Sequence, residues 1–592
     1  MLKVGFFVYI CKISTKNDIS LNISRTMKEI TKPSKMYCVL AVLLVACLFP
    51  ALAADFEVDG ICYNVINENE VEVTSPDSVK YAGEVLIPST VVNAGTTYRV
   101  TRIGNKAFYS CKDLTVVDIP EGVTSIGDNA FAYSTKLENV ELPNSLVSIE
   151  RFGFYGCSSF TTFHVPRNLA QFGDRALIGC RQIRFFSCSS LSQHFKAVDG
   201  VLYSKDMTEL YYYPIADPRT TFDVPAPVAR IHEYCFYGSP TLTQVNFPET
   251  LRWIDMNIFR DCKGIETAYI PDGVTHMDMT VFGGCSNLTS VHLPAGLDSL
   301  ANSTFMLCGK LTEVVIPRNV KYIGTYAFYQ SGVRTVTFEE GSCLETIDHD
   351  AFLECRSLQY VDMPNSIKTI EYQAFYRCDS LAWAHVSDSL TNMGTCVFAY
   401  CPLLTECEIP GGVTTIWNAI AKCEGLKRLK IGSKDSAPGV TLIKNCGIVD
   451  CEQIEHLELG ANVDSLESHA LVDLKHLKVL ISWAPVPPRC DGYWHSFDPY
   501  PQQMSVVLYV PKSSLETYRT AVEWENFKTI VAIEDVGDVN GDGMVSIADV
   551  TALIDILLGG NLDRAPYCDV NLDGDVTIAD VTALIDLLLG NG

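Results

Sequence analysis

The chain has 592 residues, of which 47% are hydrophobic and 10% aromatic, so it can bury a large core and is not wholly disordered. Its formal net charge is −25. This charge excludes a binder of duplex nucleic acid, which needs a basic footprint, and it disfavours attraction to an anionic membrane surface.

The N-terminal region contains an apolar run from Cys38 to Ala54, preceded by lysines and ending in the A-x-A pattern Ala51-Leu52-Ala53. We predict that residues 1–54 form a signal peptide, with Met27 as the expected true start. The alternatives are a membrane anchor, for which the run is short, and a lipoprotein lipidated at Cys47. No other stretch is apolar enough to span a bilayer, so we expect a mature chain without a membrane span that is secreted or displayed on the cell surface.

The middle of the chain repeats with a period of 23 residues. The template is roughly L-x-x-V-x-[IL]-P-x-x-[VL]-x-x-I-x-x-x-[AV]-F-x-x-C-x-x, with prolines at 120, 143 and 166 and again at 248, 271, 294 and 317. The alternation in L-x-x-V-x-I predicts a short strand, and the proline ends it because it cannot donate to a ladder. About 14 such repeats, each unable to bury its apolar face alone, predict a β-rich solenoid with a parallel sheet and a continuous core.

These repeats resemble the BspA-like, bacterial surface-antigen type of leucine-rich repeat, over about residues 55–535. The resemblance implies an N-terminal cap at 55–100, a solenoid at 101–482 with an insertion at 189–222, and a C-terminal cap at 483–535. It also implies a role in adhesion, because the family includes adhesins. The polar aromatic loop from Arg489 to Pro501 is either a binding loop or, more simply, an excursion from the solenoid.

The cysteines recur at one position of the repeat, where serine replaces them in other copies, so the position requires a small residue in a tight turn and not a disulfide. We predict a ladder of mostly free, buried thiols, although stacked neighbours lie within reach of a bridge. Thiols in one line do not form a tetrahedral metal cage. The positions are Cys111, Cys157, Cys180, Cys262, Cys285, Cys308, Cys355, Cys378 and Cys401, with Ser134, Ser239 and Ser331 as the replacements.

The outward positions of the predicted strands are mostly ordinary polar residues. One group differs, because Tyr360, Trp383 and His385 fall on adjacent coils. Exposed aromatic side chains on a rigid sheet are typical contact anchors, so we predict that this group contacts a protein or glycan ligand. Cross-strand packing of the rings is the simpler alternative.

No catalytic arrangement emerges from the sequence. The histidines of the outward rows lie several coils apart, and no G-x-S-x-G, H-E-x-x-H or phosphate-loop pattern occurs. We therefore predict a protein that is not an enzyme and has no catalytic residues.

The end of the chain contains one acidic phrase twice, as "DVNGDGMVSIAD" from Asp538 to Asp549 and "DVNLDGDVTIAD" from Asp569 to Asp580. This spacing of oxygen ligands, with a glycine at position 6, is that of a calcium loop, so we predict two Ca²⁺ ions. The predicted ligands of the first calcium loop are Asp538, Asn540, Asp542, Met544 through its carbonyl, Ser546 and Asp549. Those of the second calcium loop are Asp569, Asn571, Asp573, Asp575, Thr577 and Asp580.

Each loop precedes an amphipathic helical pattern, and residues 536–592 resemble a type I dockerin module. The resemblance implies a small α-helical, calcium-binding domain that docks to a cohesin-type partner on a scaffold or cell surface. The partner-reading positions 10 and 11 are polar in many dockerins but are here Ile547-Ala548 and Ile578-Ala579. The near-identity of the two halves predicts that either half can face one partner.

Together these features predict an exported, non-enzymatic interaction and adhesion protein whose tail docks in a calcium-dependent way. The alternative is a non-catalytic or carbohydrate-associated component of a cellulosome-like, polysaccharide-degrading complex.

Overall fold

The computed structural model describes residues 54–76, 80–434, 439–491, 495–498, 505–559 and 565–590. The predicted signal peptide, with the alternatives at Cys47 and Met27, lies outside the described residues except for Ala54. Within the ranges described, no helix combines the length and the apolarity needed to cross a bilayer.

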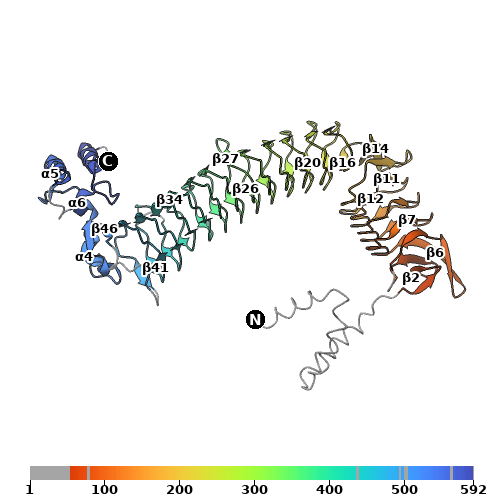
Figure 1. Ribbon diagram of the computed structural model, residues 1–592, viewed down its shortest axis with the longest axis horizontal. Coiled ribbons are helices and arrows are strands. Elements are labelled where there is room, and N and C mark those ends of the chain that lie inside the picture. The colour runs from red at the N-terminus through yellow and green to blue at the C-terminus, as the bar shows by residue number, and fades with distance from the viewer. Residues whose placement is uncertain are drawn as a thin grey trace, which may run out of the picture.

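The chain winds into a parallel β-solenoid of about 18 turns, which forms a long arc with a bend near its N-terminal third (Figure 1). The predicted fold class is confirmed, but the count of about 14 repeats is too low. The additional turns include those at the two ends of the solenoid, where the sequence keeps the alternating strand but departs from the rest of the repeat.

The first strand of each coil lies on one side of the solenoid, which we call the front face. Near the N-terminus, β1 (Phe56–Val58), β2 (Ile61–Asn67) and β3 (Glu70–Thr74) pair antiparallel, as do β5 (Thr90–Asn93) and β6 (Thr96–Ile103), while β3 and β6 pair parallel. The front-face strands are β4 (Gly83–Leu86), β7 (Leu114–Asp118), β9 (Asn139–Glu141), β11 (Thr162–Val165), β13 (Phe185–Cys188), β17 (Thr221–Asp223), β19 (Gln244–Asn246), β21 (Thr267–Tyr269), β23 (Ser290–His292), β25 (Glu313–Ile316), β27 (Thr335–Phe338), β29 (Tyr360–Asp362), β31 (Trp383–His385), β34 (Glu406–Ile409), β37 (Arg428–Ile431), β40 (His456–Leu459), β43 (Val479–Ser482), β46 (Val507–Val510) and β47 (Thr529–Ala532).

The second half of each coil contributes a shorter strand, and the last coils add a third. The second row consists of β8 (Ser125–Ile126), β10 (Ser148–Ile149), β12 (Gln171–Phe172), β18 (Arg230–Ile231), β20 (Trp253–Ile254), β22 (His276–Met277), β24 (Ser299–Leu300), β26 (Tyr322–Ile323), β28 (Thr346–Ile347), β30 (Thr369–Ile370), β32 (Asn392–Met393), β35 (Thr415–Ile416), β38 (Leu442–Ile443), β41 (Ser465–Glu467) and β44 (Arg489–Asp491). The third row consists of β33 (Phe398–Ala399), β36 (Ile420–Ala421), β39 (Ile448–Val449), β42 (Leu471–Val472) and β45 (Phe497–Asp498).

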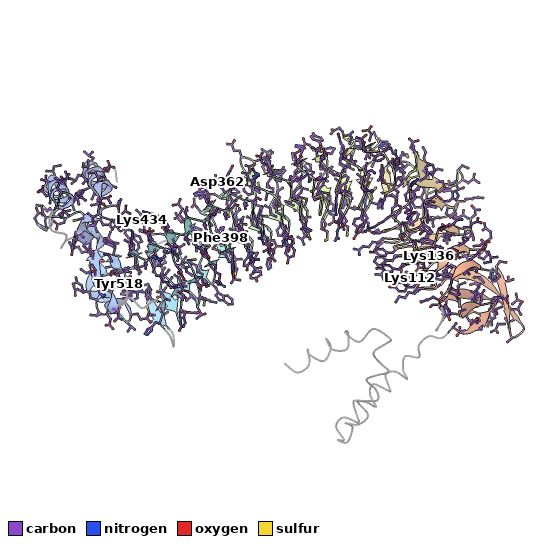
Figure 2. All side chains as sticks on the ribbon, viewed as in Figure 1. Lys112, Lys136, Asp362, Phe398, Lys434 and Tyr518 are labelled. Carbon is purple, nitrogen blue, oxygen red and sulfur yellow. The ribbon has the colours of Figure 1, made fainter. Side chains whose placement is uncertain are left out.

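The phenylalanines of the repeat stack on one another inside the solenoid. Phe282, Phe305 and Phe328 are all fully buried, and the ring of Phe305 lies 5.6 Å from that of Phe282 and 5.4 Å from that of Phe328. Phe398, labelled within the body of the solenoid in Figure 2, continues the column at 5.4 Å from Phe375. Since each ring covers the next, one coil completes the core of its neighbour.

The cysteine position does more than fit a tight turn. The residue before it adopts a left-handed conformation, as at Asp261 with φ of 60°. The Sγ of Cys285 then donates to the carbonyl of Phe259 at 3.0 Å, and the Oγ of Ser134 donates to that of Phe108 at 2.7 Å. Serine therefore replaces cysteine because both side chains are small and both can donate this bond between coils.

The ladder thiols are buried and free in the structure, as predicted. Burial raises the pKa of Cys262 and of Cys355 to about 12. An unfolded thiol keeps its usual, lower pKa, so between these values the unfolded chain binds fewer protons than the folded one. Stability should therefore fall as the pH rises above about 9.

We expect the ladder thiols to resist alkylation in the native protein at pH 8, while the exposed Cys343 reacts at once. Denaturation without a reductant should then expose every ladder thiol to the reagent. The labelled sites are counted by mass spectrometry of the alkylated protein. Fragments joined in pairs along the ladder would contradict the prediction.

The bend coincides with the insertion. Strands β14 (Phe195–Val198), β15 (Val201–Ser204) and β16 (Glu209–Tyr212) form an antiparallel meander that replaces a regular coil. The front sheet is interrupted there, since β13 pairs only with β11 and the next sheet begins at β17. The buried side chains accordingly form two large clusters that divide near residues 195–202, so the predicted continuous core is wrong at this place.

The C-terminal coils end in a compact cap followed by helices. The short helical elements are η2 (Lys512–Ser514), α4 (Leu515–Tyr518), η3 (Trp524–Asn526) and η4 (Ile533–Asp535). The tail then forms α5 (Ile547–Leu557), α6 (Ala565–Cys568) and α7 (Ile578–Leu589), which lie beside β46 at the end of the arc (Figure 1).

Candidate functional site: calcium loops and front face

The first calcium loop is closed by its two end carboxylates. Asp538 accepts backbone N–H bonds from Gly541 at 2.7 Å and Gly543 at 3.0 Å. Gly543 has φ of 87°, a conformation that glycine adopts without strain. Asp549 accepts from the backbone of Asn540 at 2.9 Å and of Ser546 at 2.8 Å, and therefore ties the end of the loop to its beginning.

The second calcium loop repeats this arrangement. Asp569 accepts from the backbone of Asp573 at 2.9 Å and of Gly574 at 3.0 Å, and Gly574 has φ of 92°. Asp580 accepts from the backbone of Asn571 at 3.2 Å and of Thr577 at 2.7 Å. Ser546 and Thr577 cap α5 and α7 in the same way, each in a capping box with the last aspartate of its loop.

The burial of these carboxylates fits a divalent cation. Asp549 and Asp580 are fully buried, and within the described residues neither forms an ion pair with a lysine, arginine or histidine. Burial raises the pKa of Asp569 to about 6, so its ionised form is less favourable than that of a solvent-exposed carboxyl. A cation in each loop would supply a compensating charge, and the hard oxygen donors suit calcium.

The loops are not a ready-made cluster of acidic side chains. Among the described residues, no three carboxylate, imidazole or thiol groups gather into one metal-binding group. The predicted ligands also include the amides of Asn540 and Asn571, the hydroxyls of Ser546 and Thr577, and the carbonyl of Met544. The individual ligand assignments therefore remain predictions.

The helices of the tail share a small core. Val550 and Leu553 of α5 pack with Val581 and Leu584 of α7, and Cys568 completes the buried group. The outer residues of both predicted apolar stripes stay exposed, because so small a module has too few other side chains to cover them. Exposed members are Ile554, Leu558, Ile585, Leu588 and Leu589.

The structure brings the three front-face candidates together. Tyr360 and Trp383 are direct partners on adjacent parallel strands, and His385 Nδ1 lies 3.0 Å from Asp362 Oδ1. Asp362 stands on the upper surface of the solenoid in Figure 2. Tyr360 and Trp383 are 43% and 40% exposed, so both rings are available to a ligand.

The ring contact of this group runs along β31. The indole of Trp383 stacks with the imidazole of His385, with ring centres 6.3 Å apart. In the described part of the chain, Tyr360 makes no ring contact with Trp383.

A groove continues from this group towards the C-terminus. It has a volume of about 340 Å³, and Trp383 and His385 lie at one end of it. Charged side chains of the next coils line it, including Lys430, which pairs with Glu408, and Arg428. The repeat pattern places Arg428, Glu408 and Lys430 at outward positions of the predicted strands. The sequence alone did not show that they lie next to the aromatic group.

Sequence reasoning missed a second feature of the front face. Outward positions on the last three coils are apolar and buried, with Ile481, Tyr509 and Val531 where earlier coils carry charged residues. Apolar residues on both faces of these strands are the sequence signal that could have revealed a covered surface.

Comparisons with known proteins identify both parts of the chain. A family model described as the BspA type leucine rich repeat region matches with six copies over residues 92–198, 211–334 and 345–478, more than half of the chain. A model described as the dockerin type I domain matches residues 536–589. No curated protein matches the chain.

Solved structures similar to the chain include leucine-rich repeat proteins from bacteria. A leucine-rich repeat protein from Eubacterium ventriosum is 22% identical, with a TM-score of 0.45 over 54% of this chain and 93% of that one. One from Bacteroides ovatus is 19% identical, with a TM-score of 0.40 over 81% and 99%. The pneumococcal vaccine antigen PcpA is 14% identical, with a TM-score of 0.33 over 81% and 98%.

Proposed function

The chain belongs to the BspA type leucine-rich repeat family and ends in a type I dockerin domain, and from this premise we propose that it is an exported, non-enzymatic adhesion protein. Repeats of this kind serve protein interaction, dockerins bind calcium and dock to a cohesin-type partner, and neither kind of domain is catalytic in general. The solenoid binds a protein or glycan outside the cell, and the tail attaches to the partner.

The observation that carries the proposal is the aromatic group beside a charged groove. Trp383 and Tyr360 offer large, rigid, exposed surfaces, while Arg428 and Lys430 line the adjoining groove. Interfaces with proteins and glycans use such aromatic anchors surrounded by polar groups. The charges on the groove walls favour a ligand with polar groups of its own.

Removing both rings should weaken ligand binding. We expect the double variant Tyr360→Ala/Trp383→Ala to weaken binding of a solenoid ligand at least tenfold, because two anchors lose their contact area. The ligand is first found by screening the full chain against matrix proteins and glycans. The matched control is Tyr269→Ala, which removes an exposed ring stacked on His292 elsewhere on the front face. A ligand that binds the double variant as tightly as the native protein would refute this assignment.

On the tail, the positions that read a partner are apolar and open. Ile547 and Ile578 are 74% and 72% exposed at equivalent places in the two halves. A cohesin-type partner for this tail should therefore present an apolar surface to them. The two predicted calcium ions hold the loops that position these residues, with ligands such as Asp538 and Asp569.

Either half of the tail should support docking. We expect Ile547→Asp or Ile578→Asp alone to lower the affinity for a cohesin-type domain by about twofold, since one of two equivalent orientations remains. The double variant should lose at least a hundredfold, and a calcium chelator should abolish binding. Pull-down with a panel of cohesins measures this, with Val522→Asp on the cap as an exposed control. Full binding in the presence of chelator would contradict the proposal.

The second candidate function is a non-catalytic component of a cellulosome-like complex. It is favoured by the dockerin domain, which places a chain on a scaffold. The identity of the solenoid's ligand distinguishes the two candidate functions. A host or neighbouring-cell protein supports adhesion, and a plant polysaccharide supports the complex.

A further inference from the structure

The front face changes character over its last three coils. The outward residues Glu408, Lys430 and Glu458 belong to one row along β34, β37 and β40. The next members of that row are Ile481, Tyr509 and Val531, which are 3%, 0% and 2% exposed. A row that is charged over three coils and becomes apolar and buried over the next three marks a covered surface.

The tail covers this surface. Tyr567 and Leu572 of the tail belong to the same apolar cluster as Ile481, Tyr509 and Val531. The approach is close, because a Cβ added at Gly574 would lie 3.0 Å from the Cβ of Lys478. The contact therefore involves the second calcium loop itself.

Polar contacts fasten the same loop. Lys478 Nζ lies 2.8 Å from Asp575 Oδ2, an ion pair that joins β43 to the loop. The buried Tyr509 hydroxyl donates to the carbonyl of Pro566 at 3.0 Å and lies 3.4 Å from Asp569 Oδ2. Asp569 is the first predicted ligand of the second loop, so one carboxylate faces both the ion site and the solenoid.

The first calcium loop differs from the second at position 7. Its position 7 is Met544, which is 68% exposed, where the second loop has Asp575 in its ion pair with the solenoid. The two loops are nearly identical in sequence, yet the ion pair between Lys478 and Asp575 belongs to the second loop.

We propose that the last three coils form a docking surface for the second calcium loop, so that calcium in this loop also fastens the tail to the solenoid. The inference rests on the proposed calcium sites. It follows that the solenoid contacts strengthen calcium binding by the second loop, because they hold its ligands in place. It also follows that the tail projects in a fixed direction, with Ile547 and Ile578 free to meet a partner.

The decisive variant is Val531→Asp in the full-length protein. It places a charge in the covered surface but leaves the inner core of the solenoid intact, because Val531 faces outward. We expect it to weaken binding of one calcium ion at least tenfold and to enlarge the radius of gyration in calcium. Isothermal titration with calcium and small-angle X-ray scattering measure the two effects. The matched control is Val315→Asp, at an exposed position of the same row, which should change neither.

A second, milder variant with its own control keeps the test valid if Val531→Asp misfolds the cap. Lys478→Gln removes the ion pair with Asp575 and should weaken the same ion two- to fivefold, while Lys475→Gln removes an exposed pair with Glu452 that does not touch the tail. Native calcium affinities and native scattering in both Val531→Asp and Lys478→Gln would overturn the inference. Binding to a cohesin is measured separately by pull-down. If the tail of a variant detaches from the solenoid but still binds a cohesin, the proposed function is unaffected. A native chain that binds no calcium would overturn both.

Discussion

Chelating calcium from the full-length protein is expected to unfold the tail and to leave the solenoid folded. The buried core of the tail is only a handful of side chains, and a module of this size supplies less than about 5 kcal/mol on its own. Without the ions, no cation would compensate the charge of the buried carboxylates of Asp549 and Asp580. Calcium binding is therefore folding energy for this module.

Hydrogen exchange read by mass spectrometry measures this outcome in segments. Peptides from α5 and α7 should lose at least a hundredfold of their protection in chelator, whereas peptides from β25 to β31 should not change. Asp549→Ala should reproduce the effect of chelator, and Asp555→Ala, an exposed carboxylate on the same helix, should not. Unchanged protection of α5 and α7 without calcium would contradict the predicted calcium sites.

Removing one ring from the phenylalanine column is expected to cost about 3–5 kcal/mol, the usual range for a buried phenylalanine replaced by alanine. Phe305→Ala is the test, because this ring is fully buried between Phe282 and Phe328. Repeats contact only their neighbours, so the loss should loosen the coils around residue 305 and spare distant ones.

Urea unfolding gives the size of this effect, and hydrogen exchange gives its location. Leu307→Ala is the control in the same coil, since its side chain is 41% exposed and should cost less than about 1 kcal/mol. Equal costs for Phe305→Ala and Leu307→Ala would mean that the column does not stabilise the solenoid.

Sequence periodicity was sufficient for the interior of each coil. The alternation of L-x-x-V-x-I, the proline after it and the phenylalanine that follows predicted the strands and the buried residues, because each feature depends on neighbours within one repeat. The same periodicity predicted that Tyr360 and Trp383 are adjacent, and the structure pairs them directly. Where the pattern weakened, at both ends and at the insertion, the count of turns and the continuity of the core were misjudged.

The cysteine position shows the limit of a local reading. Its small size was evident from the serine replacements, but the bond from Cys285 to the Phe259 carbonyl spans two coils. A hydrogen bond between residues 26 apart depends on the register of stacked coils, which the composition of one repeat does not reveal.

By itself, the sequence of this protein determined the solenoid, the buried thiols and two loops with the spacing of calcium ligands, because each is written in a local repeat. Only the tertiary structure decided that the second loop lies against the solenoid, since the sequence of a loop does not show what surrounds it. Tyr509 and Lys478 are far from that loop in the chain, and the fold alone brings them to Asp569 and Asp575.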